Sequence, residues 1–264
     1  MVNGASLAMP YLEPFLIKNL REAVDTSEVL KNNADLLADV RGFIGQEAQH
    51  YTNHRRYNEM LKANGYPELS DVEASIVADY KKFSKRSLAW RLAYSAGFET
   101  MTVGLTEWLM DNKDELFGDA DPVVSSLVLW HMVEETEHKT VAFDVYEAIS
   151  GSYWMRALGL LCGSFHVGFI SRRGYRAMLK RDGRWSTLRS RLELWRMVSK
   201  FFRKVGPAML RGLLPNHHPN QVIDPKWIVT WQNAYADQDS EKGTHQIPLL
   251  NTDKGRVSPE LAIG

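Results

Sequence analysis

The sequence predicts an all-helical fold, a four-helix bundle followed by extra C-terminal helices. Three observations predict it. Gly and Pro are scarce within long stretches of the chain, β-branched residues form few runs, and helix-ending signals such as Gly65 with Pro67 separate the stretches. The 264 residues are enough for one large domain, and eight Trp with ten each of Met, Phe and Tyr can fill a sizeable core.

The first two helices are expected to form a hairpin. The first covers residues 10–24, and its prolines fall in the opening turns, which tolerate them. The polar residues 25–27 break it. The second helix covers residues 34–64, where Gly followed by Pro in residues 65–67 is the usual punctuation of a helix end.

A second hairpin should follow. A connecting helix at 72–83 leads to a third bundle helix at 87–112. Asp121 as N-cap and Pro122 at the first helical position open a fourth helix, which continues without a break to residue 149. Gly151 stops it.

The chain beyond the bundle differs in character. Residues 153–171 are almost entirely apolar, and a basic amphipathic stretch follows at 185–204. We therefore expect a bundle over residues 1–150, apolar and basic amphipathic helices packed on it over 151–212, and an irregular C-terminal arm over 213–264.

Charge and composition narrow the classes of partner and compartment. The chain carries 32 Lys and Arg against 32 Asp and Glu, so no global charge favours nucleic acid. Cys162 is the only cysteine, which excludes an intramolecular disulfide and favours a reducing compartment. No apolar stretch resembling a secretory signal opens the sequence. We expect a cytoplasmic protein.

Positive charge is concentrated near the C-terminal third. Residues 172–204 contain twelve Lys or Arg against Asp182 and Glu193, a local charge of +10. An apolar segment followed by a basic, Trp-bearing amphipathic helix is the pattern of an element that lies on a membrane surface. Residues 153–204 are therefore expected either to pack on the bundle or in a homodimer interface, or to make peripheral membrane contact.

Two short segments carry the chemistry: QEAQH at residues 46–50 and EETEH at 134–138. Each contains Glu-x-x-His. Residues three apart lie on one face of a helix, so a carboxylate and an imidazole can bind the same metal ion from one rigid element. In a bundle with two metal ions, each of the other two helices also supplies a Glu.

The depth of each Glu in its hairpin identifies the other two. Glu47 lies thirteen residues into the second helix, and Glu13 stands at the matching depth of the first. Glu99 and Glu135 match in the same way, and the separations within the two pairs are 34 and 36 residues. The neighbouring residues are apolar, where unpaired charges would be costly and a metal ion would neutralise them.

Two further histidines follow the same helical spacing. His131 precedes Glu135 by four residues and is expected to be a ligand, whereas His54 follows His50 by four and is either a ligand or a supporting or surface residue. Four carboxylates with imidazoles and no thiolate favour two iron ions, with Mn also acceptable. The predicted metal ligands are Glu13, Glu47, His50, Glu99, His131, Glu135 and His138.

Three segments carry a resemblance to a known family: YLEPFLIKNLREA, FIGQEAQHYTNHRRYNEML and WHMVEETEHKTVAFDVYEAI. Over about residues 10–235 the chain resembles a bacterial family labelled predicted metal-dependent hydrolase, whose members look like ferritin-superfamily bundles. The resemblance implies a ferritin-like bundle and hydrolase activity. The ligand set is instead similar to that of di-iron arylamine N-oxygenases, which also have an extra His one turn before the last Glu-x-x-His.

Three functions remain open at this point. The ligand set favours a di-iron oxidoreductase or oxygenase that activates O₂ and acts on a small or hydrophobic organic substrate, with an electron donor as partner. The family label implies a hydrolase in which two metals generate a bridging hydroxide. A non-catalytic metal-binding protein is the third. No obvious general base accompanies the ligands in the sequence, so hydrolysis ranks second.

Overall fold

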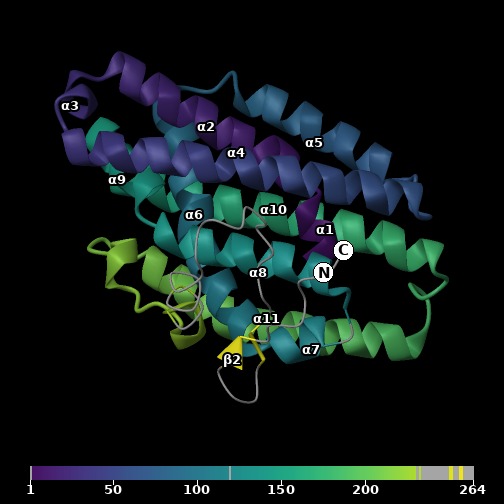
Figure 1. The fold of residues 1–264 in the computed structure, drawn as a ribbon. Helices are drawn as coiled ribbons and strands as arrows, with labels where there is room; N and C mark the ends of the chain where they lie inside the picture. Colours follow the sequence, from purple (N-terminus) through teal and green to yellow (C-terminus); the bar gives the residue numbers. More distant parts are fainter. Residues whose placement is uncertain (1, 119, 230–231, 233–249, 252–255, 258–264) are drawn as a thin grey trace, which may run out of the picture.

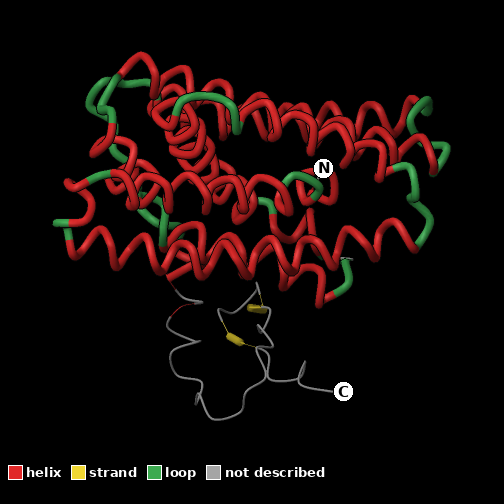
Figure 2. Tube along the Cα trace, turned by 90° about the horizontal axis from the view of Figure 1, so that it is seen from above, coloured by secondary structure: helices red, strands yellow, loops and turns green. Residues whose placement is uncertain are grey.

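The computed structural model describes residues 2–118, 120–229, 232, 250–251 and 256–257. Its long helices lie alongside one another and are joined by short loops (Figures 1 and 2). The strands among the described residues are two of two residues each, β1 (Leu250–Asn251) and β2 (Arg256–Val257), which pair in antiparallel fashion. The predicted all-helical class is confirmed.

The first three bundle helices begin and end, and the fourth begins, close to where the sequence predicts. Side-chain caps mark two of the starts: Asn33 Oδ1 accepts from the Leu36 amide at 3.1 Å, and Ser87 Oγ accepts from the Trp90 amide at 3.3 Å. The helices are α2 (Met9–Thr26), α4 (Ala34–Ala63), α6 (Leu88–Asp111) and α8 (Pro122–Glu137).

The fourth predicted helix is not continuous, which corrects the prediction for residues 122–149. It breaks at 138–140 into α8 and α9 (Val141–Ile149), and the Val141 amide donates to the His138 carbonyl at 3.0 Å across the break. Neither Gly nor Pro stands there. The Lys139 side chain leaves the helix to bond the Val222 carbonyl at 2.8 Å, a contact 83 residues away that local sequence does not encode.

Three helices lie between the bundle helices: α3 (Glu28–Lys31), α5 (Leu69–Phe83) and α7 (Lys113–Phe117). A short helix, α1 (Val2–Ser6), precedes α2. Ser27 ends α2 and caps α3 with its side chain, which accepts from the Leu30 amide at 3.4 Å. The predicted break at residues 25–27 is therefore confined to Ser27, between α2 and α3.

Two long helices follow the bundle, α10 (Tyr153–Arg181) and α11 (Leu188–Gly212), and both pack on α6. The approach of α10 to α6 is very close: a Cβ added to Gly97 would lie 2.3 Å from the carbonyl carbon of Gly159. Arg156 donates to the Gly212 carbonyl at 2.9 Å and so ties the end of α11 to α10. Among the described residues, no helix is both long enough and apolar enough to cross a membrane.

The last predicted region, 213–264, lies largely outside the described residues. Its described part contains one short 3₁₀ helix, η1 (Pro219–Gln221). In this part, His218 Nε2 lies 2.8 Å from Asp144 Oδ1 of α9, at hydrogen-bond distance. This part of the chain therefore lies beside the break that follows α8.

Candidate metal centre

The seven predicted ligands lie together in the interior, where α2, α4, α6 and α8 meet. Every one of them is at most 4% exposed. The residues come from α2 (Glu13), α4 (Glu47 and His50), α6 (Glu99), α8 (His131 and Glu135) and the first position after α8 (His138). Their role as ligands stays a prediction, but their assembly into one cluster is a feature of the structure.

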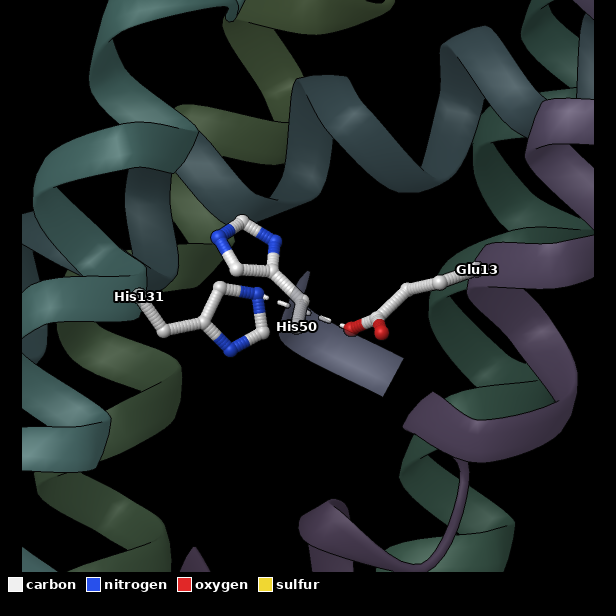
Figure 3. Close-up of side chains that lie close together, drawn as sticks. All are labelled: Glu13, His50 and His131. Carbon is white, nitrogen blue, oxygen red and sulfur yellow. Dashed lines mark ion pairs between the residues drawn. The ribbon is translucent and has the colours of Figure 1, made fainter. Parts of the chain in front are cut away.

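The cluster has two ends. Glu13, His50 and His131 form the first end, where one ligand atom from each lies within 4.8 Å of the others (Figure 3). Within it, His131 Nε2 lies 3.6 Å from Glu13 Oε1. The second group with mutually close ligand atoms consists of Glu47, Glu99, Glu135 and His138.

Glu47 and Glu135 connect the two ends. Glu135 places Oε1 at 2.7 Å from His131 Nε2 and Oε2 at 3.5 Å from His138 Nε2. Glu47 Oε1 lies 3.2 Å from His138 Nε2 and 3.8 Å from His50 Nδ1. Both carboxylates therefore stand where bridging ligands between two ions would stand, and Glu13 and Glu99 lie to either side.

Many polar atoms of this cluster are buried without a hydrogen-bond partner among the described residues. They include both carboxylate oxygens of Glu13, Glu47 and Glu99, together with His50 Nδ1 and His138 Nε2. Buried polar groups are nearly always satisfied, because leaving them unpaired costs free energy. Converging unpaired oxygen and nitrogen atoms fit metal ions, and the absence of thiolate from this set fits Fe or Mn.

The pKa values of the four carboxyl groups are shifted in opposite directions. Burial, followed by the neighbouring carboxylates, raises the pKa of Glu13 and of Glu99 well above the ordinary value. Burial also acts to raise the pKa of Glu47 and Glu135, but the adjacent histidines outweigh it and lower both. Without metal ions, the surroundings therefore favour the protonated form of Glu13 and Glu99 and the ionised form of Glu47 and Glu135.

The histidines balance the two ionised carboxylates. Burial acts to lower the pKa of His50, yet Glu134 and Glu47 outweigh it and raise that pKa to about 8. Glu135 and Glu47 likewise overcome burial and raise the pKa of His138 to about 10. Protons can thus neutralise the centre in place of metal ions, and metal binding would have to displace them.

Each ligand histidine turns one ring nitrogen to the cluster and the other to a supporting residue. His50 Nε2 lies 2.8 Å from Glu134 Oε2, and His138 Nδ1 lies 2.8 Å from Gln46 Oε1. Partners of this kind fix the ring orientation and tautomer of metal-bound histidine. The supporting contacts leave His50 Nδ1 and His138 Nε2 directed at the carboxylates.

These two supporting residues are exchanged between the motifs. Gln46 precedes Glu47 of the first Glu-x-x-His and supports His138 of the second, whereas Glu134 precedes Glu135 of the second and supports the histidine of the first. Sequence reasoning missed both. The available signal was a long polar side chain directly before each motif's Glu, but which histidine it reaches depends on how the helices pack.

His54 is not part of the ligand cluster. Its Nε2 lies 2.7 Å from His131 Nδ1, and its Nδ1 lies 2.8 Å from Ser6 Oγ, so both ring nitrogens are engaged. Ser6 Oγ donates its proton to Asn58 Oδ1 at 2.8 Å, and Asn58 Nδ2 donates back to the Ser6 carbonyl at 3.0 Å. The alternative that His54 supports a ligand is the one the geometry favours.

This chain of contacts determines the tautomer of His131. Because the Ser6 hydroxyl proton goes to Asn58, Ser6 Oγ must accept from His54 Nδ1. Neutral His54 then accepts at Nε2 from the Nδ1 proton of His131. Burial lowers the pKa of His54 well below its ordinary value, and burial also lowers that of His131. A metal ion at the cluster would then take up the Nε2 lone pair of His131, whereas without an ion the 2.7 Å contact between His131 Nε2 and Glu135 Oε1 needs a proton between the two atoms.

Two small cavities in the described part of the chain lie apart from the centre. Each has a volume of about 10 Å³ and is lined in part by Val103, with none of the seven residues in its walls. A water molecule or a diatomic gas is of the size that such spaces admit.

Comparison with known proteins identifies the family. Residues 1–222 match the family described as predicted metal-dependent hydrolase, and this range includes all seven clustered residues and their supporting partners. No curated protein and no solved structure matches the chain significantly. The buried carboxylate and histidine groups supply the metal-binding capacity that the family description requires, and the chain belongs to the predicted metal-dependent hydrolase family.

Proposed function

We propose that the seven clustered residues bind two metal ions and that the protein is a dinuclear metalloenzyme. The observation that carries this proposal is the convergence of buried, unpartnered oxygen and nitrogen atoms from four helices. Glu47 and Glu135 would lie between the ions. Glu13, His50 and His131 would complete the first site, and Glu99 and His138 the second.

The two sites would not be equivalent. The first takes two imidazoles from the chain and the second takes one. Imidazole suits Fe and other borderline ions, whereas a carboxylate-rich site also accepts Mn. We therefore propose iron for both sites, with Mn as the ion most able to compete at the second.

The reaction proposed first is O₂ activation, followed by oxidation of a small or hydrophobic organic substrate. Two bound iron ions would supply electrons to O₂, which needs far less room than an organic substrate. The closed, apolar surroundings support this choice: Phe43 lies over His138, with ring centroids 4.6 Å apart, and Met132 and Val133 of α8 are buried. An electron donor would be a required partner.

Glu134 is the residue placed to hold or pass a proton. Its Oε2 contacts the fully buried His50 at 2.8 Å, its Oε1 accepts from Trp130 Nε1 at 3.0 Å, and its side chain is 20% exposed. It therefore links the interior of the cluster to solvent. Because it sits behind His50, it would act through that histidine and not at the reacting atoms.

Hydrolysis is the second candidate, and the family description favours it. Two metal ions lower the pKa of a bridging water and so generate hydroxide near neutral pH. The same seven residues would hold them. This reaction also requires an organic substrate to reach the buried cluster, which takes far more room than a diatomic gas does.

Metal analysis combined with an oxygen-reactivity assay tests the proposal. The protein is isolated from iron-supplemented cells, reduced without oxygen and then mixed with O₂ while its absorption spectrum is followed. About two irons per chain with a transient, O₂-dependent absorption supports the oxidoreductase. The hydrolase would be the better assignment if the protein held two metal ions, showed no response to O₂ and released product from a panel of esters or phosphoesters.

A pair of matched variants tests whether the metal ions bind at this cluster. Glu135→Gln removes a carboxylate that reaches both ends of the cluster, and it should abolish binding of at least one ion. Glu59→Gln on α4 changes an exposed carboxylate that pairs with Lys62 at the surface, and it should leave the metal content unchanged. Absence of metal even after reconstitution of the natural chain would refute the dinuclear centre.

A further inference from the structure

The outward face of α11 carries a stripe of large apolar side chains that no other described part of the chain covers. These side chains are between 56% and 74% exposed. They recur at intervals of three, four, seven and eight residues, so at about 3.6 residues per turn they share one side of the helix. The stripe consists of Leu188, Leu192, Trp195, Phe202 and Leu210.

The opposite face of α11 already holds the helix on the protein. Val205 is buried, and Phe201 packs edge-on against Trp108 of α6 with ring centroids 5.3 Å apart. Figure 1 places α11 at the edge of the assembly, with α2, α4 and α5 on the far side. The apolar stripe is therefore not needed to attach α11 to the core, and it faces away from it.

Positive charge borders the stripe on both sides. The helix contains seven Lys or Arg against Glu193. By helical position, Arg191 lies beside one edge of the stripe and Arg203 beside the other. Neither has an ion-pair partner among the described residues, whereas Lys200 and Lys204 pair with acidic residues of α6 and α7. The charges nearest the stripe are thus left for another partner.

We infer that α11 docks the protein on an anionic lipid bilayer. An apolar stripe flanked by arginines matches the two layers of such a surface, because the stripe enters the acyl boundary while the guanidinium groups meet lipid phosphates. The long arginine side chains can reach the headgroups while their aliphatic parts stay on apolar surface. Docking is peripheral, and α11 lies along the surface.

A second copy of the chain fits this face less well. In a symmetric dimer the same patch meets itself, which would bring the basic borders of two α11 helices together. Like charges at that distance repel, whereas an anionic membrane attracts them. Charge complementarity therefore selects the lipid surface over self-association.

A second stripe of exposed apolar side chains, on α10, has no exposed positive charge along most of its length. Trp154, Leu158, Phe165 and Phe169 are 48% to 79% exposed. Arg156 is the only Lys or Arg between residues 153 and 171, and it is buried and donates to the Gly212 carbonyl at 2.9 Å. Exposed arginines follow Phe169 by one turn, at 172 and 173. Trp154, at the other end of the stripe, thus provides a matched control: it is an exposed aromatic residue without exposed positive charge on its part of the helix.

Vesicle sedimentation of the full chain tests the docking surface. Vesicles of phosphatidylcholine alone are compared with vesicles of phosphatidylcholine mixed with phosphatidylserine, at low and high salt. We expect the protein to pellet with the anionic vesicles at low salt and to be released at high salt. No pelleting at low salt, or equal pelleting with both kinds of vesicle, would overturn the inference.

Substitutions at exposed positions locate the contact. The double variant Leu192→Ser/Trp195→Ser should lower partitioning onto anionic vesicles by about tenfold or more, and Arg191→Glu/Arg203→Glu should abolish its salt-sensitive part. Trp154→Ser on α10 should partition like the natural chain, and circular dichroism checks that every variant is folded. If Trp154→Ser lost binding equally, or if α11 variants only dissolved a dimer in sedimentation velocity, the lipid surface would be the wrong occupant.

Discussion

Each predicted ligand histidine is oriented by the side chain that its other ring nitrogen contacts. Asn58 Oδ1 accepts a hydrogen bond from Ser6, Ser6 Oγ accepts one from His54 Nδ1, and His54 Nε2 accepts one from His131 Nδ1. This leaves His131 Nε2 to face the predicted metal site. Glu134 and Gln46 do the same for His50 and His138, one with a carboxylate and the other with an amide. The three histidine rings therefore have different partners: a carboxylate for His50, an amide oxygen for His138 and a second imidazole for His131.

Removing the carboxylate behind His50 should weaken metal binding without removing a ligand. Glu134→Ala is expected to lower the affinity for Fe or Mn by roughly 10- to 100-fold, because His50 loses the partner that fixes its ring. Competition with a chromophoric chelator measures the affinity. Glu59→Ala on the surface of α4 is the control, and equal affinities for the two variants would contradict a supporting role for Glu134.

Metal binding should release protons, and its affinity should rise with pH. In the absence of metal, the pKa values of His50, about 8, and of His138, about 10, keep protons on both near neutral pH, and the raised pKa values of Glu13 and Glu99 favour their protonated forms. His50 loses its proton around pH 8 and His138 around pH 10, so the proton-linked gain in affinity should continue above pH 8. Calorimetric titration in buffers of different ionisation enthalpy counts the protons, and a pH-independent affinity would disagree with this assignment.

At the scale of elements, close backbone contact between α6 and α10 fixes how the C-terminal helices attach. A Cβ on Gly159 would lie 2.1 Å from the Ala93 carbonyl oxygen, a backbone atom that a side-chain rotation cannot move. Gly163 makes a similar approach to α6 at the Phe98 amide, 3.0 Å from an added Cβ. α10 is thus seated on the same helix that carries Glu99.

Two alanine substitutions in α10 should have opposite effects on stability. Gly159→Ala is expected to lower the free energy of unfolding by about 1–3 kcal/mol or more, because it forces two helix backbones apart. Gly168→Ala has nothing within 4 Å of the new Cβ and should raise it by about 0.4–1 kcal/mol. Urea unfolding of the two variants measures both, and a stable Gly159→Ala protein would mean that α10 and α6 are not in contact.

The helices themselves were predictable from sequence, and so was the depth of the four Glu residues. Caps, Gly–Pro punctuation and helical periodicity are local signals, and equal depth in two hairpins places Glu13 beside Glu47 and Glu99 beside Glu135. The break at 138–140 was not predictable from the local sequence, because Lys139 in this break donates to the Val222 carbonyl, 83 residues away. The exchanged support of His50 and His138 also depends on packing between helices and has no local signature.

For the whole molecule, the centre joins helices from the beginning and the middle of the chain. The predicted ligands span residues 13 to 138 and occupy four separate helical segments and the turn after one of them. Without bound ions, the same interior holds four buried carboxyl groups that only protons and histidines neutralise. The stability of the fold and the occupancy of the centre are therefore linked.

Metal loading should stabilise the entire fold. A free metal concentration 100 times the dissociation constant should add about 2.7 kcal/mol to the free energy of unfolding, provided that the unfolded chain does not bind the ion. Chelation followed by re-addition of Fe or Mn, monitored by the melting temperature, measures the gain. Glu135→Gln should lose most of this response while Glu59→Gln keeps it, and a melting temperature insensitive to metal in the natural chain would argue against occupancy of the centre.

The exchange of supporting residues between the two Glu-x-x-His motifs also constrains how the gene can change. A mutation at position 46 alters the half of the centre encoded around position 138, and a mutation at 134 alters the half encoded around position 50. Neither motif therefore works as an independent unit. Among diverged descendants, we expect substitutions at 46 to be accompanied by compensating substitutions at 137, whose carboxylate accepts from Gln46 Nε2 at 2.9 Å, so that the two motifs evolve together.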